Sequence, residues 1–230
     1  MFRSKSRAII VPQSEHLHLA GELARLWGNA DFDLPPFDRE SIVAGIGGHD
    51  RGYGYIDNWP IGGMDEETWN DIARRGFAMQ CSDPVADLIA KYHVRRLAGY
   101  SDLPSRKAMD AEFSAKIAET LVAHGLSQDV FDRIDRITNL CDMISFAFCF
   151  EEESTGTVEI FPRNCGENQP ITVEYKVSGS RIDCSPWPFT VEEYSGYITA
   201  FRAEGYPATL DPVILPYQLS STQQLLSRQI

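Results

Sequence analysis

Residues 137–150 constrain the fold most, because this stretch is almost wholly apolar and has a single charged side chain, Asp142. It extends a helical pattern, so we predict a helix over residues 128–150 that is buried on most of its surface. A buried aspartate is rare unless it is paired or bound to a metal. Asp142 therefore needs a partner, which is either a metal ion or an arginine such as Arg51 or Arg95.

Other helices precede this one, and each is bounded by turn signals. Pro84 suits the first turn of one helix, and Gly125 suits the end of another. The predicted helices span residues 14–27, 38–49, 82–97 and 108–124. After residue 153, alternating and β-branched residues predict strands over residues 157–161, 171–177 and 181–184. Further helices are predicted near residues 191–202 and 220–227.

These elements predict a mainly α fold with a small β-containing C-terminal addition. Residues 1–150 would form a helical, metal-binding body, and residues 151–230 would pack on it as an extension within one structural domain. A chain of 230 residues is long enough to bury a full hydrophobic core.

Charge and cysteine usage limit the partners of the chain. A net charge of −12 argues against binding to nucleic acid or to an anionic membrane, which both attract positive surfaces. A small anionic substrate remains compatible, because the local potential of a cleft decides its binding. The apolar run over residues 8–11 is too short for a signal peptide or a membrane span. Five cysteines without paired spacing predict reduced thiols in the cytoplasm, and a homo-oligomer is left open.

His16 is the first candidate metal ligand. It shares a helical stripe with Ala20, Leu23 and Trp27, whereas His18 lies on the polar face of the same predicted helix. A single buried histidine is more often a hydrogen-bonded core residue than a ligand. His16 therefore becomes a strong candidate only in combination with others, and His18 is predicted to be a surface residue.

The adjacent pair His49-Asp50 supplies two more candidates. His49 continues the apolar stripe of Ile42 and Ile46, and the two neighbours could reach one ion through nitrogen and oxygen. The alternative is a helix C-terminus at which His49 meets free carbonyls and Asp50 caps the next turn. Glycines at positions 45, 47 and 48 are unusual within a helix and predict the close approach of another segment.

His93 and His124 are weaker candidates. His93 continues a stripe on a helix that also carries Lys91 and Arg95, so it is a ligand, a substrate contact or a satisfied core histidine. His124 precedes Gly125 at a predicted helix end, where a histidine stabilises the helix dipole without further chemistry.

The order His16, His49-Asp50, Asp142 resembles the HD superfamily of metal-dependent phosphohydrolases, which implies a helical bundle with a metal site. A closer resemblance, which covers most of the chain, is to the domain of unknown function 3891 family. The chain has Tyr53 and Ser185 where that family pattern has Trp and Asp. The matching segments are Gln13-Ser14-Glu15-His16 with Gly21, Trp27-Gly28-Asn29, His49 to Tyr53, Asp57 with Pro60, His93, Leu140 to Ser145, and Ser185 to Phe189.

The resemblance implies a divalent metal, one or two ions of Mn, Fe, Co or Ni, that activates a water molecule for phosphoester or nucleotide hydrolysis. Each candidate residue then has an expected role. The metal ligands would be His16, His49, Asp50 and Asp142, with His93 as a further ligand; Asp50 and His93 would be catalytic; and Arg51, Lys91, Arg95 and Asp57 would contact the substrate.

Two other functions stay open at this level. A di-iron oxygenase of HD type would use His93 and His124 as extra ligands. A non-catalytic module would bind a metal or sense a ligand, but such a domain would often have lost part of its ligand set. Because the set is complete here, an enzyme is favoured.

Overall fold

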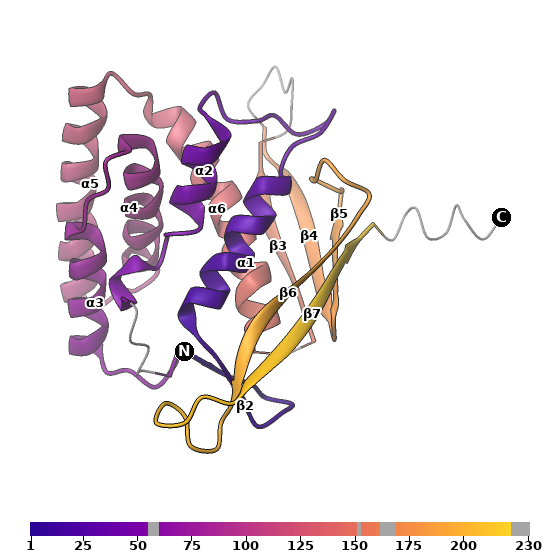
Figure 1. The fold of residues 1–230 in the computed structure, drawn as a ribbon. Coiled ribbons are helices and arrows are strands. Elements are labelled where there is room, and N and C mark those ends of the chain that lie inside the picture. The colour runs from indigo at the N-terminus through magenta and orange to yellow at the C-terminus, as the bar shows by residue number, and fades with distance from the viewer. Residues whose placement is uncertain (55–59, 151–152, 162–168, 222–230) are drawn as a thin grey trace.

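A seven-stranded mixed sheet is covered on one side by layers of helices (Figure 1). The computed structural model describes residues 1–54, 60–150, 153–161 and 169–221. Within these ranges the elements are β1 (Phe2–Arg3), β2 (Ile9–Val11), α1 (Gln13–Leu26), α2 (Arg39–Ile46), the 3-10 helix η1 (Arg51–Tyr53), α3 (Glu66–Ala78), α4 (Pro84–Gly99), α5 (Pro104–His124), α6 (Gln128–Cys149), β3 (Ser154–Ile160), β4 (Ile171–Ser178), β5 (Arg181–Ser185), β6 (Glu193–Arg202) and β7 (Pro212–Ser220).

The sheet joins the two ends of the chain. Its strand order is β1-β2-β6-β7-β5-β4-β3, and every neighbouring pair is antiparallel except β5 and β7. Ile9 and Ile10 of β2 pair with Arg202 and Phe201 of β6. The N-terminal strands therefore belong to the same sheet as the C-terminal ones.

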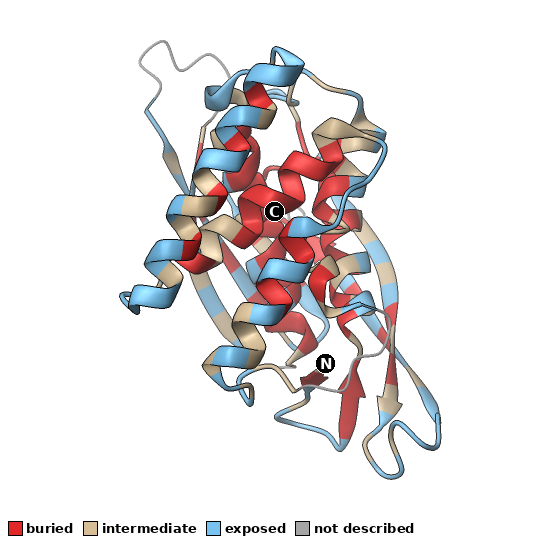
Figure 2. Ribbon diagram, turned by 90° about the vertical axis from the view of Figure 1, so that its left-hand side faces the viewer, coloured by how far each residue is buried: buried red, intermediate tan, exposed pale blue. Residues whose placement is uncertain are grey.

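The helices stack outward from the sheet. α6 packs on β3 and β4, and α1 contacts β6 (Figure 1). α2 and α4 pack on α1 and α6, while α3 and α5 lie against α4 on the outside. Buried residues are concentrated where these layers meet (Figure 2). The candidate ligands lie in this interior, between α1, α2, α4 and α6.

The mainly α prediction, with its HD-like bundle and small β addition, is wrong. Residues 193–202, predicted to be helical, form β6, in which Tyr194, Gly196, Ile198 and Ala200 alternate with more exposed neighbours. This period of two and the aromatic and β-branched content are typical of a strand. The sequence pattern does not predict β1, β2 or β7.

Two prolines in β7 prevent its prediction as a strand from the sequence. Pro212 and Pro216 argue against an internal strand, because proline cannot donate a ladder hydrogen bond. In the sheet, β5 pairs only with Gln218 and Leu219 of β7. The rest of β7 is therefore an edge on that side, where proline is tolerated.

Most of the predicted helices in residues 1–150 are confirmed. α1, α4, α5 and α6 lie where periodicity and turn signals place them, with ends that differ by a few residues. Asp83 caps α4 by accepting hydrogen bonds from Val85 and Ala86, and Gly125 ends α5 with a φ of 63°. The strands β3, β4 and β5 are also confirmed. The sequence pattern does not predict α3, and most of the helix predicted near residues 220–227 lies outside the described residues.

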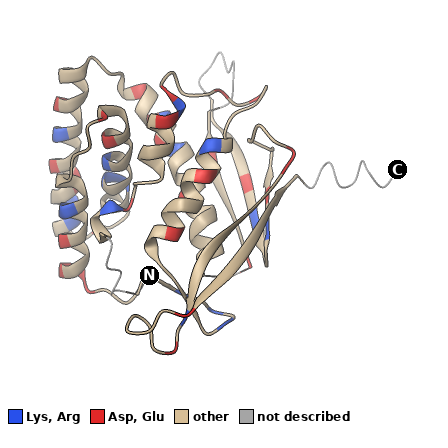
Figure 3. Cartoon of the chain, in the orientation of Figure 1, with Lys and Arg blue, Asp and Glu red and all other residues tan. Residues whose placement is uncertain are grey.

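Charges of both signs are spread along the outer helices α3 and α5 (Figure 3). None of the described helices is both long and apolar enough to cross a membrane.

Candidate metal centre

Three segments that are distant in sequence bring His16, His49 and Asp142 together. His16 lies on α1 and Asp142 on α6, whereas His49 lies in the turn just after α2, which ends at Ile46 rather than at His49 as predicted. The predicted close approach at the glycines is confirmed. An added Cβ on Gly45 would lie 2.7 Å from Ile89 Cβ, so α2 can cross α4 closely only without a side chain there.

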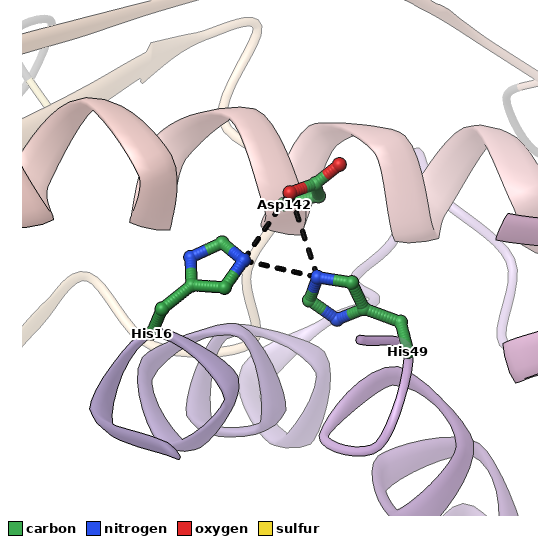
Figure 4. Close-up of side chains that lie close together, drawn as sticks. All are labelled: His16, His49 and Asp142. Atoms are coloured by element: carbon green, nitrogen blue, oxygen red, sulfur yellow. Dashed lines mark hydrogen bonds and ion pairs between the residues drawn. The ribbon is translucent and has the colours of Figure 1, made fainter. Parts of the chain in front are cut away.

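The two imidazoles and the carboxylate point at one place (Figure 4). Nε2 of His16 lies 3.0 Å from Nε2 of His49, and Asp142 Oδ1 lies 3.3 Å and 3.5 Å from these two nitrogens. Both histidines are fully buried, and the Asp142 side chain is 10% exposed. This convergence needs a cation or a proton to be stable.

Neighbouring groups fix which ring nitrogens carry hydrogen. His49 Nδ1 lies 2.6 Å from the carbonyl oxygen of Ile46, which can only accept, so His49 donates from Nδ1. His16 Nδ1 lies 2.8 Å from Ser145 Oγ, whose hydroxyl donates to the Asp142 carbonyl at 3.0 Å and so accepts from His16. In the neutral imidazoles, both Nε2 atoms then present lone pairs to each other.

This arrangement fits a metal ion. Two donors that each lie about 2.1 Å from one ion are about 3.0 Å apart at a right angle and about 3.4 Å apart at a tetrahedral angle. The three observed separations fall at or near these values. Metal-bound histidines almost always donate their other ring nitrogen to a carbonyl, carboxylate or water, and the Ile46 carbonyl and the Ser145 hydroxyl would play that part for a bound ion.

Asp50 and His93 border the three candidate ligands. Asp50 Oδ2 lies 3.9 Å from His16 Nε2 and 4.0 Å from His49 Nε2, and it accepts a hydrogen bond from Gln13 Nε2. Asp50 Oδ1 lies 3.0 Å from His93 Nε2. His49, Asp50 and His93 form a second group of donor atoms close enough to hold an ion.

The surrounding charges lower the pKa values of both Asp50 and Asp142 and so favour their ionised forms. Burial would raise the pKa of Asp142, but His16 and His49, which can donate to it from Nε2 when they are protonated, hold that pKa well below its ordinary value. Burial lowers the pKa of His49, but the hydrogen bond to Asp142 and the charges of Asp50 and Asp142 outweigh burial and raise it. A proton and a metal ion would therefore compete for the same position.

The described residues among those predicted to bind substrate contact other protein groups instead. Arg51 donates to the carbonyl oxygens of Gly76 and Met79 and pairs with Asp87 at 2.8 Å. Lys91 pairs with the same Asp87 at 2.6 Å. Arg95 stacks over the Tyr92 ring at 4.8 Å, and Asp57 lies outside the described residues. Neither Arg51 nor Arg95 pairs with Asp142; Arg96 lies nearest, with its Nη2 3.9 Å from Asp142 Oδ2.

Three residues to which the sequence analysis assigns no role contact the candidate centre: Gln13, Ser145 and Arg96. A spacing signal was present for each. Gln13 and Ser145 lie three residues from His16 and Asp142, so they share a helical face with these ligands. Arg96 lies three residues after His93 on α4 in the same way.

The predicted surface role of His18 is confirmed, since it is exposed on α1, and His124 is exposed at the end of α5. The segment of residues 186–189 lies at the opposite end of α1 from His16. Gly28 donates to the Pro188 carbonyl, and Asn29 donates to the Trp187 carbonyl. This segment fastens the end of α1 to the sheet side of the molecule and does not line the ligand cluster.

Comparisons with known proteins identify a family for the chain but no characterised relative. No curated protein and no solved structure matches the sequence. Residues 1–200 match the profile of a family described as protein of unknown function, DUF3891. That match covers most of the chain, which therefore belongs to the DUF3891 family.

Proposed function

We propose that the protein is a metal-dependent hydrolase that cleaves a phosphoester, such as a phosphomonoester or a nucleotide. One observation carries the proposal: two histidines whose Nδ1 atoms are already engaged direct their Nε2 lone pairs at one point beside the ionised Asp142. Buried groups of this kind favour a cation strongly, and a divalent metal with nitrogen and oxygen ligands matches them.

His16, His49 and Asp142 would hold the ion, with Asp50 Oδ2 next to it. A divalent Mn, Fe, Co or Ni ion supplies a lowered pKa for a bound water and polarises a phosphoryl oxygen. The order of these ligands along the chain resembles that of HD phosphohydrolases, which supports phosphoester cleavage over other hydrolyses. The fold lends no such support, because it contains the large sheet.

Asp50 would accept a proton from the attacking water. Its side chain is 14% exposed, more than those of His16 and His49, and it lines a small pocket with Tyr53, Trp69 and other residues. Gln13 donates to one of its oxygens and His93 Nε2 lies 3.0 Å from the other, so the carboxylate has a fixed orientation. A positioned carboxylate within reach of the water is what general base catalysis requires.

The phosphate charge of a substrate would have to be met mainly at the ion. Arg51 and Lys91 are both engaged with Asp87, and Arg96 is engaged with Asp135 and Asn139. This distribution favours small substrates whose phosphoryl group reaches the ion directly.

The test combines metal analysis with an activity screen. The full chain is purified without chelator or metal-affinity resin, analysed for bound metals, and assayed with phosphomonoesters and nucleotides in the presence of Mn²⁺. His16→Gln and Asp142→Asn should lose both metal and turnover. His18→Gln is the matched control, because His18 lies two residues from His16 on the exposed face of the same helix. Equal metal content and turnover in wild type and His16→Gln would rule out the proposal.

A further inference from the structure

We infer that Arg96 holds His93 as a hydrogen-bond donor to Asp50, so that His93 positions this carboxylate instead of binding metal, and the centre takes one ion rather than two. The inference rests on the metal site of the proposed function. It concerns the second donor group, formed by His49, Asp50 and His93, which by distance alone could hold another ion.

The contacts of His93 define its tautomer. Its Nε2 lies 3.0 Å from Asp50 Oδ1, and an ionised carboxylate oxygen can only accept a hydrogen bond. Its Nδ1 lies 2.9 Å from Arg96 Nη2, and a guanidinium nitrogen can only donate. Both contacts are satisfied together only when Nε2 carries the hydrogen and Nδ1 carries the lone pair.

The other tautomer satisfies neither contact. A hydrogen on His93 Nδ1 would face the N–H of Arg96, and Asp142 Oδ2 lies 3.6 Å away, beyond hydrogen-bond distance. The lone pair on Nε2 would then face the Asp50 carboxylate. Metal binding through Nε2 requires this unfavourable arrangement, because the ligand atom must be free of hydrogen.

Arg96 is itself held in place by α6. Its Nε donates to Asp135 Oδ1 at 3.2 Å, and its Nη1 donates to Asn139 Oδ1 at 2.7 Å. Asp135, Asn139 and Asp142 are spaced by four and three residues, so they form one face of α6 toward α4. The Arg96 side chain is 10% exposed and stays charged. A planar guanidinium with its other nitrogens occupied cannot turn away from His93 without losing these contacts.

The remaining donors do not make a second site. His49 Nδ1 is occupied by the Ile46 carbonyl, and His49 Nε2 faces His16 Nε2 in the first group. Without His93 only Asp50 is left in the second group, and its two oxygens already face Gln13 and His93. Divalent transition metals in stable protein sites need three or four protein ligands. One ion per chain is consistent with the hydrolase and disfavours a di-iron oxygenase.

The direct test is a ring-nitrogen NMR spectrum of the ¹⁵N-histidine-labelled full chain, recorded without metal and with Zn²⁺. The His93 signals are assigned by their loss in His93→Gln. We expect His93 in the Nε2–H form in both samples, while zinc shifts the Nε2 signals of His16 and His49. A His93 that carries its hydrogen on Nδ1, or whose Nε2 signal shifts on zinc binding, would overturn the inference.

Stoichiometry gives an independent readout. Wild type and His93→Gln should each bind one Zn²⁺ per chain, because a glutamine amide can still donate to Asp50. His93→Ala, which cannot, should bind zinc about 10–100-fold more weakly. Two ions in wild type and one in His93→Gln would show that His93 is a ligand. One ion without phosphoester turnover would contradict the proposed function alone, whereas no zinc uptake would contradict both.

The role of Arg96 is tested by Arg96→Lys. We expect a mixture of His93 tautomers in this variant, because lysine lacks the fork that occupies Asp135, Asn139 and His93 together. A merely structural role would lower stability and leave the His93 spectrum unchanged, which would refute the role of Arg96. If the variant does not fold, the wild-type spectrum still decides the tautomer.

Discussion

Ser145 is the residue whose removal best tests the proposed metal centre, because it contacts the candidate ligand His16 without being a candidate itself. Its buried hydroxyl accepts from His16 Nδ1 at 2.8 Å and donates to the Asp142 carbonyl at 3.0 Å. Ser145→Ala removes both contacts and leaves the His16 Nδ1–H without its acceptor in the interior. The imidazole is then free to take the other tautomer or to rotate.

The size of the effect follows from these contacts. A buried donor without a partner costs about 1–3 kcal/mol, which alanine's better helix propensity offsets by about half a kcal/mol at most. Loss of the partner of a metal-bound histidine costs about 10–100-fold in metal affinity. That range corresponds to about 1.4–2.7 kcal/mol of binding free energy. We therefore expect Ser145→Ala to lower both stability and metal affinity.

The assay pairs denaturant unfolding of the metal-free protein with calorimetric titration by Mn²⁺. Thr138→Val is the matched control, because Thr138 is also buried on α6 and its hydroxyl donates to the Ile134 carbonyl at 2.9 Å. Thr138→Val should lower the stability but change the Mn²⁺ affinity by no more than about twofold, because Thr138 lies about 10 Å from Ser145 along the helix. A Ser145→Ala variant that loses stability as Thr138→Val does, yet binds Mn²⁺ as tightly as wild type, would refute the reasoning.

Three further predictions concern packing, metal removal and pH. Gly45→Ala should destabilise the fold by about 1–3 kcal/mol in thermal unfolding, because the added Cβ would meet Ile89. The control Ala44→Ser, on the exposed side of α2, should be near neutral. Equal unfolding midpoints for the two variants would contradict the close crossing of α2 and α4. Chelation should lower the unfolding free energy by about 2.7 kcal/mol relative to protein in metal at 100 times its dissociation constant, and a chelator-insensitive midpoint would count against a bound ion. The hydrogen bond from Arg25 holds the pKa of Glu22 below its ordinary 4.5, so this stabilisation is present above that value and is lost as the pH falls through the lowered pKa. Wild type should therefore lose more stability than Arg25→Gln between about pH 5 and pH 3, and parallel pH profiles would show that the pair contributes nothing.

Much of the candidate centre could be predicted from sequence because helical spacing separates buried from exposed positions. The three-to-four-residue stripe distinguishes His16 from His18, and the apolar surroundings of Asp142 mark it as a buried charge. Gly45, Gly47 and Gly48, just before His49, predict the close approach of another segment, and the structure confirms it in the crossing of α2 and α4 at Gly45.

The partners of these residues could not be predicted in the same way. Arg51, Arg95 and Arg96 look alike in sequence, but only Arg96 lies beside His93 and Asp142. Lys91 and Arg51 both turn to Asp87, a residue that no motif singled out. Long flexible side chains choose among several acceptors, and this choice depends on how helices from distant parts of the chain are packed.

The sequence by itself determined the helices α1, α4, α5 and α6, because a helix closes its hydrogen bonds within four residues and shows its buried face as a local period. Only the tertiary structure decided the sheet. β2 and β6 are paired across about 190 residues of chain, and β7 accepts its prolines only because β5 pairs with a short part of it. A strand takes its hydrogen bonds from partners elsewhere in the chain, so residues 193–202 could read as a helix until β7 and β2 were in place beside them.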